Sequence, residues 1–69
     1  MTQCEKVLRH LREHGTITAA EAVYEYGIFR LAARVSDLKR DGHRINRRMV
    51  SAKNRYGETV NFAEYRLEA

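Results

Sequence analysis

The chain has 69 residues, which is enough for one hydrophobic core and too short for two. With 43% hydrophobic and 32% charged residues it has the composition of a folded globular domain, which excludes a disordered chain. No apolar run approaches the roughly 18 residues of a membrane span, the charged N-terminal residues do not fit a signal peptide, and a single cysteine cannot form an internal disulfide. We therefore expect a cytoplasmic protein that does not contact membranes.

The positive charge is concentrated in the middle of the chain. The net charge is +4, and residues 27–57 alone carry nine Lys and Arg against two Asp, whereas the segments before and after them are slightly acidic. A contiguous basic segment of this kind indicates a polyanionic partner more strongly than the net charge does.

A first helix is predicted over residues 2–14. Cys4, Val7, Leu8 and Leu11 recur at helical spacing and define one apolar face, and Gly15 is a usual C-terminal residue of a helix. Cys4 lies on this inward face, which favours a small hydrophobic side chain over a nucleophile.

A second helix is predicted over residues 18–26, after a short extended link. Thr18 and Glu21 have the spacing of a capping box, in which the two side chains accept hydrogen bonds from each other's backbone amides. Gly27 then predicts a tight turn with a left-handed residue.

A third helix is predicted over residues 29–41. Leu31, Val35 and Leu38 lie within a narrow arc of the helical wheel, so this arc should pack inward. Phe29 is expected at the edge of the core. Arg34 lies on the flank of this arc. The opposite arc carries polar or small residues, which are Arg30, Ala33, Ser36, Asp37 and Arg40.

The alternating pattern of residues 43–67 predicts a β-hairpin with a polar loop that ends near Gly57. The alternation of its second strand is interrupted, because Val60 and Phe62 share one face whereas Tyr65 and Leu67 share the other. Two explanations remain open: a bulge near Ala63, or an outer part of the hairpin that lies beyond the core.

This order of elements resembles the winged helix-turn-helix family of DNA-binding domains, in particular its small stand-alone bacterial and phage members. The residues that carry the resemblance are the 17–21 entry to the second helix, the Gly27-Ile28 turn, the Leu31/Val35/Leu38 ladder, the 53–57 loop and the final Tyr65-Arg66-Leu67. The resemblance covers residues 3–67 and implies a single α+β domain, 1–69, with the third helix as recognition helix and the hairpin as wing. In one departure from the family pattern, no Ser, Thr, Asp or Asn lies between Gly27 and Leu31 to cap that helix.

Arg30, Arg34 and Arg40 of the predicted recognition helix can reach outward to DNA, and we favour Arg30 and Arg34 for guanine edges. Ala33 allows close approach or contact with a thymine methyl. Asp37 either accepts a hydrogen bond from cytosine or pairs with a neighbouring arginine, and we favour the ion pair. For each arginine the alternative is a solvated surface charge. The predicted wing contacts are Arg47, Arg48, Lys53, Asn54 and Arg55.

We expect no enzyme activity, no metal and no cofactor. His10 and His14 have a metal-compatible spacing but lack a third ligand, and no nucleophile with a positioned base can be assembled. The predicted function is binding of double-stranded DNA, as a small transcriptional regulator or a phage-type accessory factor, by a monomer that can pair on DNA. The alternatives are a protein-interaction adaptor, which would expose Tyr24, Phe29, Val60 and Phe62, and an RNA-binding protein.

Overall fold

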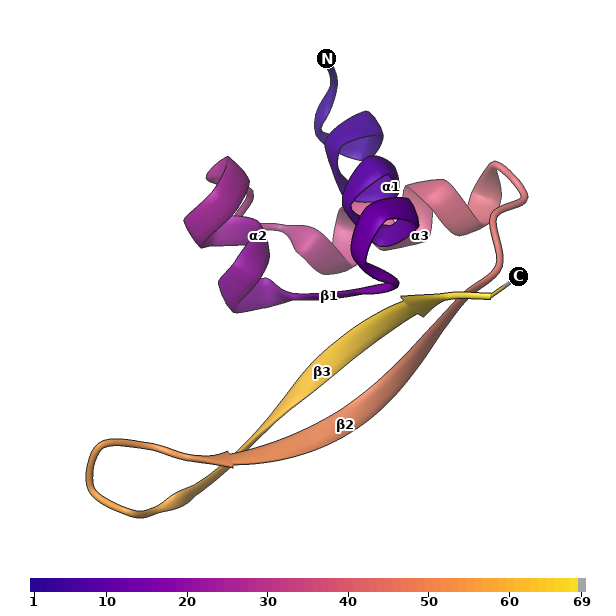
Figure 1. Ribbon diagram of the computed structural model, residues 1–69. Helices are drawn as coiled ribbons and strands as arrows, with labels where there is room; N and C mark the ends of the chain where they lie inside the picture. Colours follow the sequence, from indigo (N-terminus) through magenta and orange to yellow (C-terminus); the bar gives the residue numbers. More distant parts are fainter. Residues whose placement is uncertain (69) are drawn as a thin grey trace.

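The computed structural model describes residues 1–68 and has the predicted α+β architecture (Figure 1). Three helices are followed by a β-hairpin, and the short link after the first helix adds a third strand to the sheet. The elements in chain order are α1 (Gln3–His14), β1 (Thr16–Thr18), α2 (Ala19–Tyr26), α3 (Leu31–Arg40), β2 (Ile45–Lys53) and β3 (Thr59–Leu67). The strand order is β1-β3-β2 with antiparallel pairs.

Capping boxes begin the first two helices. The predicted box of α2 is confirmed: the Thr18 hydroxyl accepts a hydrogen bond from the Glu21 amide at 3.3 Å, and Glu21 Oε1 accepts one from the Thr18 amide at 2.9 Å. Thr2 and Glu5 form the same kind of capping box at the start of α1. Gly27 ends α2 with a φ of 68°, a left-handed conformation that favours glycine.

The third helix begins later than its periodicity predicts. It starts at Leu31 instead of residue 29, and Arg30 precedes it with φ −112° and ψ 56° and no side-chain cap. The residues before Leu31 are taken up by the turn that closes α2, in which the Ile28 amide donates a hydrogen bond of 3.0 Å to the Ala22 carbonyl and the Ile28 side chain is buried in the core. Phe29 and Arg30 consequently belong to the turn between α2 and α3.

The hydrophobic core lies between the three helices and the base of the sheet. Leu31, Val35 and Leu38 of α3 are each 3% exposed, so the predicted inward arc of this helix is confirmed. Tyr65 and Leu67 pack against the core from β3. The other buried hydrophobic residues are Val7, Leu11, Ile17, Ala22, Ile28 and Ile45.

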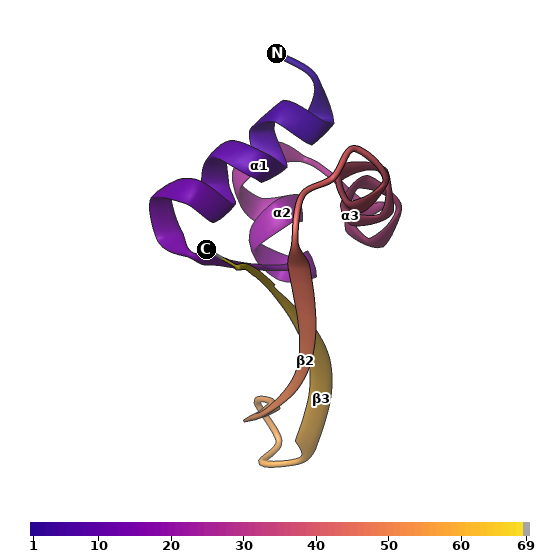
Figure 2. The same ribbon diagram turned by 90° about the vertical axis from the view of Figure 1, so that its right-hand side faces the viewer.

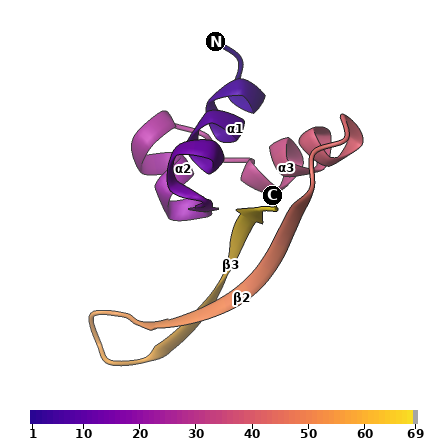
Figure 3. The same cartoon turned by 45° about the vertical axis from the view of Figure 1, so that its right-hand side comes forward.

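The hairpin projects from the helices as a two-stranded ribbon, which Figures 2 and 3 show from two further sides. Its strands pair one to one from Ile45↔Leu67 to Lys53↔Thr59, so there is no bulge near Ala63. The other explanation is therefore the right one: the outer part of the hairpin lies beyond the core. Val60 and Phe62 lie beyond the core on the face opposite Ile45 and are 40% and 38% exposed. The ribbon therefore has two faces of different character.

None of the helices in residues 1–68 is both long and apolar enough to cross a membrane.

The capping box of α2 should contribute measurably to stability. Thr18→Ala should lower the free energy of unfolding by about 1 kcal/mol, because the Glu21 amide loses its acceptor. Thr18→Ser keeps the hydroxyl and serves as the matched control. Urea unfolding of both variants and of the parent protein measures the difference, and equal stability of the Ala and Ser variants would contradict the capping role.

Candidate nucleic-acid interface

The orientation of α3 about its own axis gives the helix two different flanks. Leu31, Val35 and Leu38 face the core, and the residues on either side of this buried stripe face in opposite directions. One flank lies against α1 and carries Arg34 and Asp37. The other lies toward the hairpin and carries Ala32, Ser36 and Lys39.

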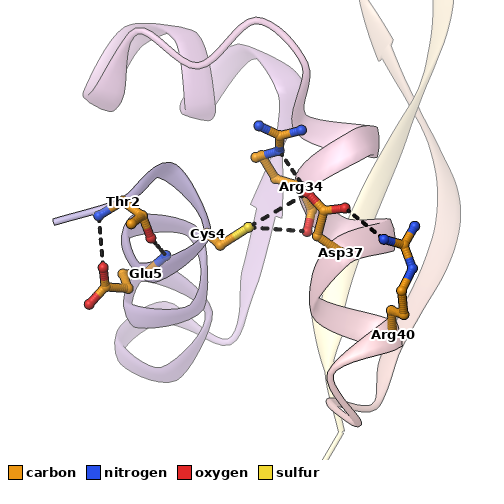
Figure 4. A network of polar contacts seen from close by, with 6 residues as sticks. All are labelled: Thr2, Cys4, Glu5, Arg34, Asp37 and Arg40. Carbon is orange, nitrogen blue, oxygen red and sulfur yellow. Dashed lines mark hydrogen bonds and ion pairs between the residues drawn. The ribbon is translucent and has the colours of Figure 1, made fainter.

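The flank that lies against α1 holds a cluster of polar contacts (Figure 4). Asp37 Oδ2 lies 3.2 Å from Arg34 Nε, and Asp37 Oδ1 lies 3.6 Å from Arg40 Nη1. The predicted ion pair of Asp37 is therefore confirmed, with both neighbouring arginines. Arg34 Nε is buried, and its contact with Asp37 is an ion pair without hydrogen-bond geometry.

Cys4 of α1 completes this cluster. Its Sγ lies 3.9 Å from Asp37 Oδ2 and 4.0 Å from the Arg34 carbonyl oxygen. Burial raises the pKa of the Cys4 thiol, the charge of Asp37 raises it further, and Arg34 opposes them. Cys4 packs against the core, in agreement with its predicted role as a small hydrophobic side chain.

The flank of α3 toward the hairpin borders an open groove. Two hollows, of about 330 and 360 Å³, share Ala32 and Tyr65 and so lie next to each other. The first extends to Ala19 at the start of α2, and the second to Arg47 of β2. We call these two hollows together the α3–hairpin groove.

Some of the predicted recognition-helix residues border this groove. Arg30 and Ala33 line the first hollow, and Arg40 is exposed near the end of α3 with its side chain 77% accessible. Arg34 and Asp37 lie on the other flank, with side chains 29% and 35% accessible. The structure thus places Arg30 and Ala33 at the groove and Arg34 and Asp37 on the other flank, whereas Arg40, which pairs with Asp37, lines neither hollow.

Two groove residues, Ser36 and Lys39, were not among the predicted contacts. Both are exposed and line the second hollow. The helical wheel places Lys39 beside Val35 but does not tell which flank of α3 meets α1 and which stays open. Only the positions of α1 and the hairpin decide this.

The predicted wing residues also differ in their orientation. Arg47 shares its strand face with Ile45 and lines the groove, whereas the neighbouring Arg48 lies on the opposite face. Lys53 lies at the outer end of β2, where its Nζ donates a hydrogen bond of 2.8 Å to the Thr59 hydroxyl. Arg48 Nη2 donates a hydrogen bond of 3.0 Å to Glu64 Oε1. Arg55 is exposed in the loop between β2 and β3.

Asn54 has a structural role in this loop. Its Oδ1 accepts hydrogen bonds from the Tyr56 amide at 2.9 Å and from the Glu58 amide at 3.0 Å. Asparagine commonly stabilises turns in this way. Asn54 therefore holds the loop in the conformation that presents Arg55.

Phe29 is not at the edge of the core, contrary to the prediction. It is 81% exposed, because Ile28 fills the core position and the turn directs the next residue outward. Phe29 lines the first hollow of the groove together with Arg30.

Of the two spaced histidines of α1, His10 is buried and His14 is exposed. His10 is 5% exposed and its Nδ1 lies 2.6 Å from the Tyr26 hydroxyl, while the ring of His14 lies 4.5 Å from that of His10. In residues 1–68, no group of three His, Cys, Asp or Glu side chains is placed to hold a metal ion.

A three-helix domain whose last helix borders a basic β-ribbon has the architecture of a winged helix. The family model described as "Winged helix-turn-helix domain" matches residues 2–69, and the chain belongs to this family. The family typically binds DNA and is generally non-catalytic. No curated protein and no solved structure matches the chain significantly.

The environment of Cys4 predicts that its thiol is alkylated slowly near neutral pH and faster as the pH rises. In the folded protein, alkylation by iodoacetamide should titrate with a pKa above the ordinary value of 9.0, and Asp37→Asn should lower this pKa because it removes a nearby negative charge. A raised thiol pKa also means that Cys4 favours folding below its ordinary pKa, and that this contribution is lost as the pH rises through the folded-state pKa.

Rates of alkylation between pH 7 and 11 test this prediction. Asp41→Asn is the matched control and should have a smaller effect, since Asp41 contributes less than Asp37 to the raised pKa. An unchanged titration in the Asp37 variant would show that the cluster does not control the thiol.

Proposed function

We propose that the protein binds double-stranded DNA selectively through the α3–hairpin groove. The observation that carries this proposal is the separation of charge around α3. Asp37 lies on the α1 side, where its carboxylate pairs with Arg34 and lies 3.9 Å from Cys4 Sγ. Arg30, Lys39 and Arg47 line the groove on the other side.

The dimensions of α3 support its insertion in the major groove. An α-helix with its side chains is about 10–12 Å in diameter, and the major groove is about 12 Å wide. Ala32, Ala33 and Ser36 are small, which allows the helix backbone to approach the base edges closely. Arg30, at the N-terminal end, is the residue we propose for paired contacts with guanine O6 and N7.

The hairpin supplies contacts to the flanking backbone or minor groove. Arg47 lines the α3–hairpin groove, and Lys53 and Arg55 lie farther out, at the end of β2 and in the loop, as cations for the flanking phosphates. Arg48 is turned away and paired with Glu64, so we assign it a smaller share of the binding energy. Arg34 is assigned the seam between α1 and α3 instead of a base contact.

The biological role we propose is that of a small transcriptional regulator or a phage-type accessory factor. A single module of this size buries about 600–1,000 Å² on DNA, which limits the affinity of one copy. We therefore propose that the protein is monomeric alone and pairs on adjacent sites of the DNA.

A second candidate function is a protein-interaction adaptor. It is favoured by exposed apolar side chains outside the groove: Tyr24 of α2 is 88% exposed, and Val60 and Phe62 lie together on the hairpin face opposite Ile45. Exposed apolar patches are typical of protein contact surfaces.

Binding titrations with variants of matched charge test the DNA proposal. The protein should bind duplex DNA more tightly than single-stranded DNA or RNA, and binding should weaken steeply with salt. Arg30→Ala should cost about 1–3 kcal/mol on a selected sequence and reduce discrimination among sequences. Arg47→Ala should weaken binding to all duplexes alike and lower the salt slope by about 1.

Arg34→Ala and Arg48→Ala are the matched controls, because they remove the same charge outside the groove. Arg34→Ala should change the affinity for DNA less than Arg30→Ala does, and Arg48→Ala should change it less than Arg47→Ala does. No binding to any duplex at low salt would refute the proposal in favour of the adaptor. Tighter binding to RNA would indicate the RNA-binding alternative.

A further inference from the structure

Phe29 is an unusual residue to leave in solvent beside a basic groove. It is 81% exposed although its neighbours Ile28 and Leu31 are buried, and nothing in the turn requires an aromatic residue at this position. A phenylalanine here covers none of the core. Its position in front of α3 places it at the end of the helix that we propose goes deepest into the DNA major groove.

The hollow beside Phe29 is mostly apolar and has one cation at its border. It has a volume of about 330 Å³, and its lining includes Phe29, Ala32, Ala33, Ala63 and Tyr65 together with Arg30. Such a lining does not suit a phosphate, which requires several donors. It suits an apolar group that lies next to a hydrogen-bond acceptor.

In the major groove of DNA, that apolar group is the 5-methyl of thymine. Each base pair presents its own pattern there, and thymine is the base that adds a methyl group. Guanine presents the two acceptors that an arginine contacts in pairs. A phenylalanine and an arginine in consecutive positions therefore match a thymine that neighbours a guanine.

We propose that Phe29 and its hollow bind the 5-methyl group of a thymine adjacent to the base that Arg30 contacts. This inference rests on the proposed function and adds a specificity-determining residue to it. Phe29 supplies the apolar contact, and Ala32 and Ala33 keep the space open for the methyl group. Burial of one methyl group raises the affinity about fourfold.

Replacement of thymine by deoxyuridine tests the inference directly, since it removes only the 5-methyl group and keeps base pairing. A duplex selected for tight binding is made with deoxyuridine at one thymine at a time. The parent protein should lose about fourfold in affinity at one or two positions and little elsewhere. Phe29→Ala should bind the thymine and deoxyuridine forms of these positions alike.

Tyr56→Ala is the matched control, because Tyr56 is an aromatic residue with 80% exposure in the hairpin loop. It should keep the preference for thymine. Phe29→Leu, which keeps an apolar side chain, should retain part of it. Since Phe29 and Tyr56 are both exposed, Phe29→Ala, Phe29→Leu and Tyr56→Ala should all unfold at the temperature of the parent protein.

The outcomes separate this inference from the function on which it rests. Duplex binding by the parent protein with no loss at any deoxyuridine position would overturn the role of Phe29 and leave DNA binding standing. Full thymine preference in the Phe29→Ala variant would also overturn it, and would assign the methyl contact to another residue. Absence of duplex binding by the parent protein would overturn both proposals.

Discussion

Burial of the Leu31, Val35 and Leu38 stripe determines the orientation of α3, and most of the candidate interface depends on it. A chain of this length has one small core, and α3 contributes three of its large side chains. Rotation of α3 by one residue would move this stripe by about 100° and expose part of it. The core thus decides which residues of α3 meet α1 and which remain open.

The same constraint separates the charges of the basic segment. Arg34 and Asp37 fall on the flank against α1, where they compensate each other beside Cys4. Ser36 and Lys39 fall on the opposite flank and border the groove. The strands repeat this division, since residues that alternate along β2 face either the groove, as Arg47 does, or the opposite side, as Arg48 does.

The fold was largely predictable because each element carries a local signal. The Thr18–Glu21 capping box, Gly27 and the Leu31/Val35/Leu38 stripe are short-range patterns, and each has the predicted consequence in the structure. Periodicity places the start of α3 two residues too early, because it does not register the turn that closes α2 and buries Ile28 before the helix begins at Leu31.

The site was less predictable because it depends on contacts between distant segments. The sequence places Arg34 and Lys39 on the two sides of one apolar stripe and does not tell which side α1 covers. The size and apolar character of Phe29 predict a place at the edge of the core, but Ile28 occupies the core position and Phe29 is exposed. The faces of the hairpin became assignable only with the unbroken register from Ile45 to Lys53.

The central claim is that duplex DNA occupies the α3–hairpin groove, and the most direct test is a map of backbone amide shifts by nuclear magnetic resonance during a duplex titration. The largest shifts should fall in residues 29–40 and 45–55, with small shifts along the outer face of α1. Shifts concentrated around Val60, Phe62 and Tyr24, or no shifts at all, would contradict the account.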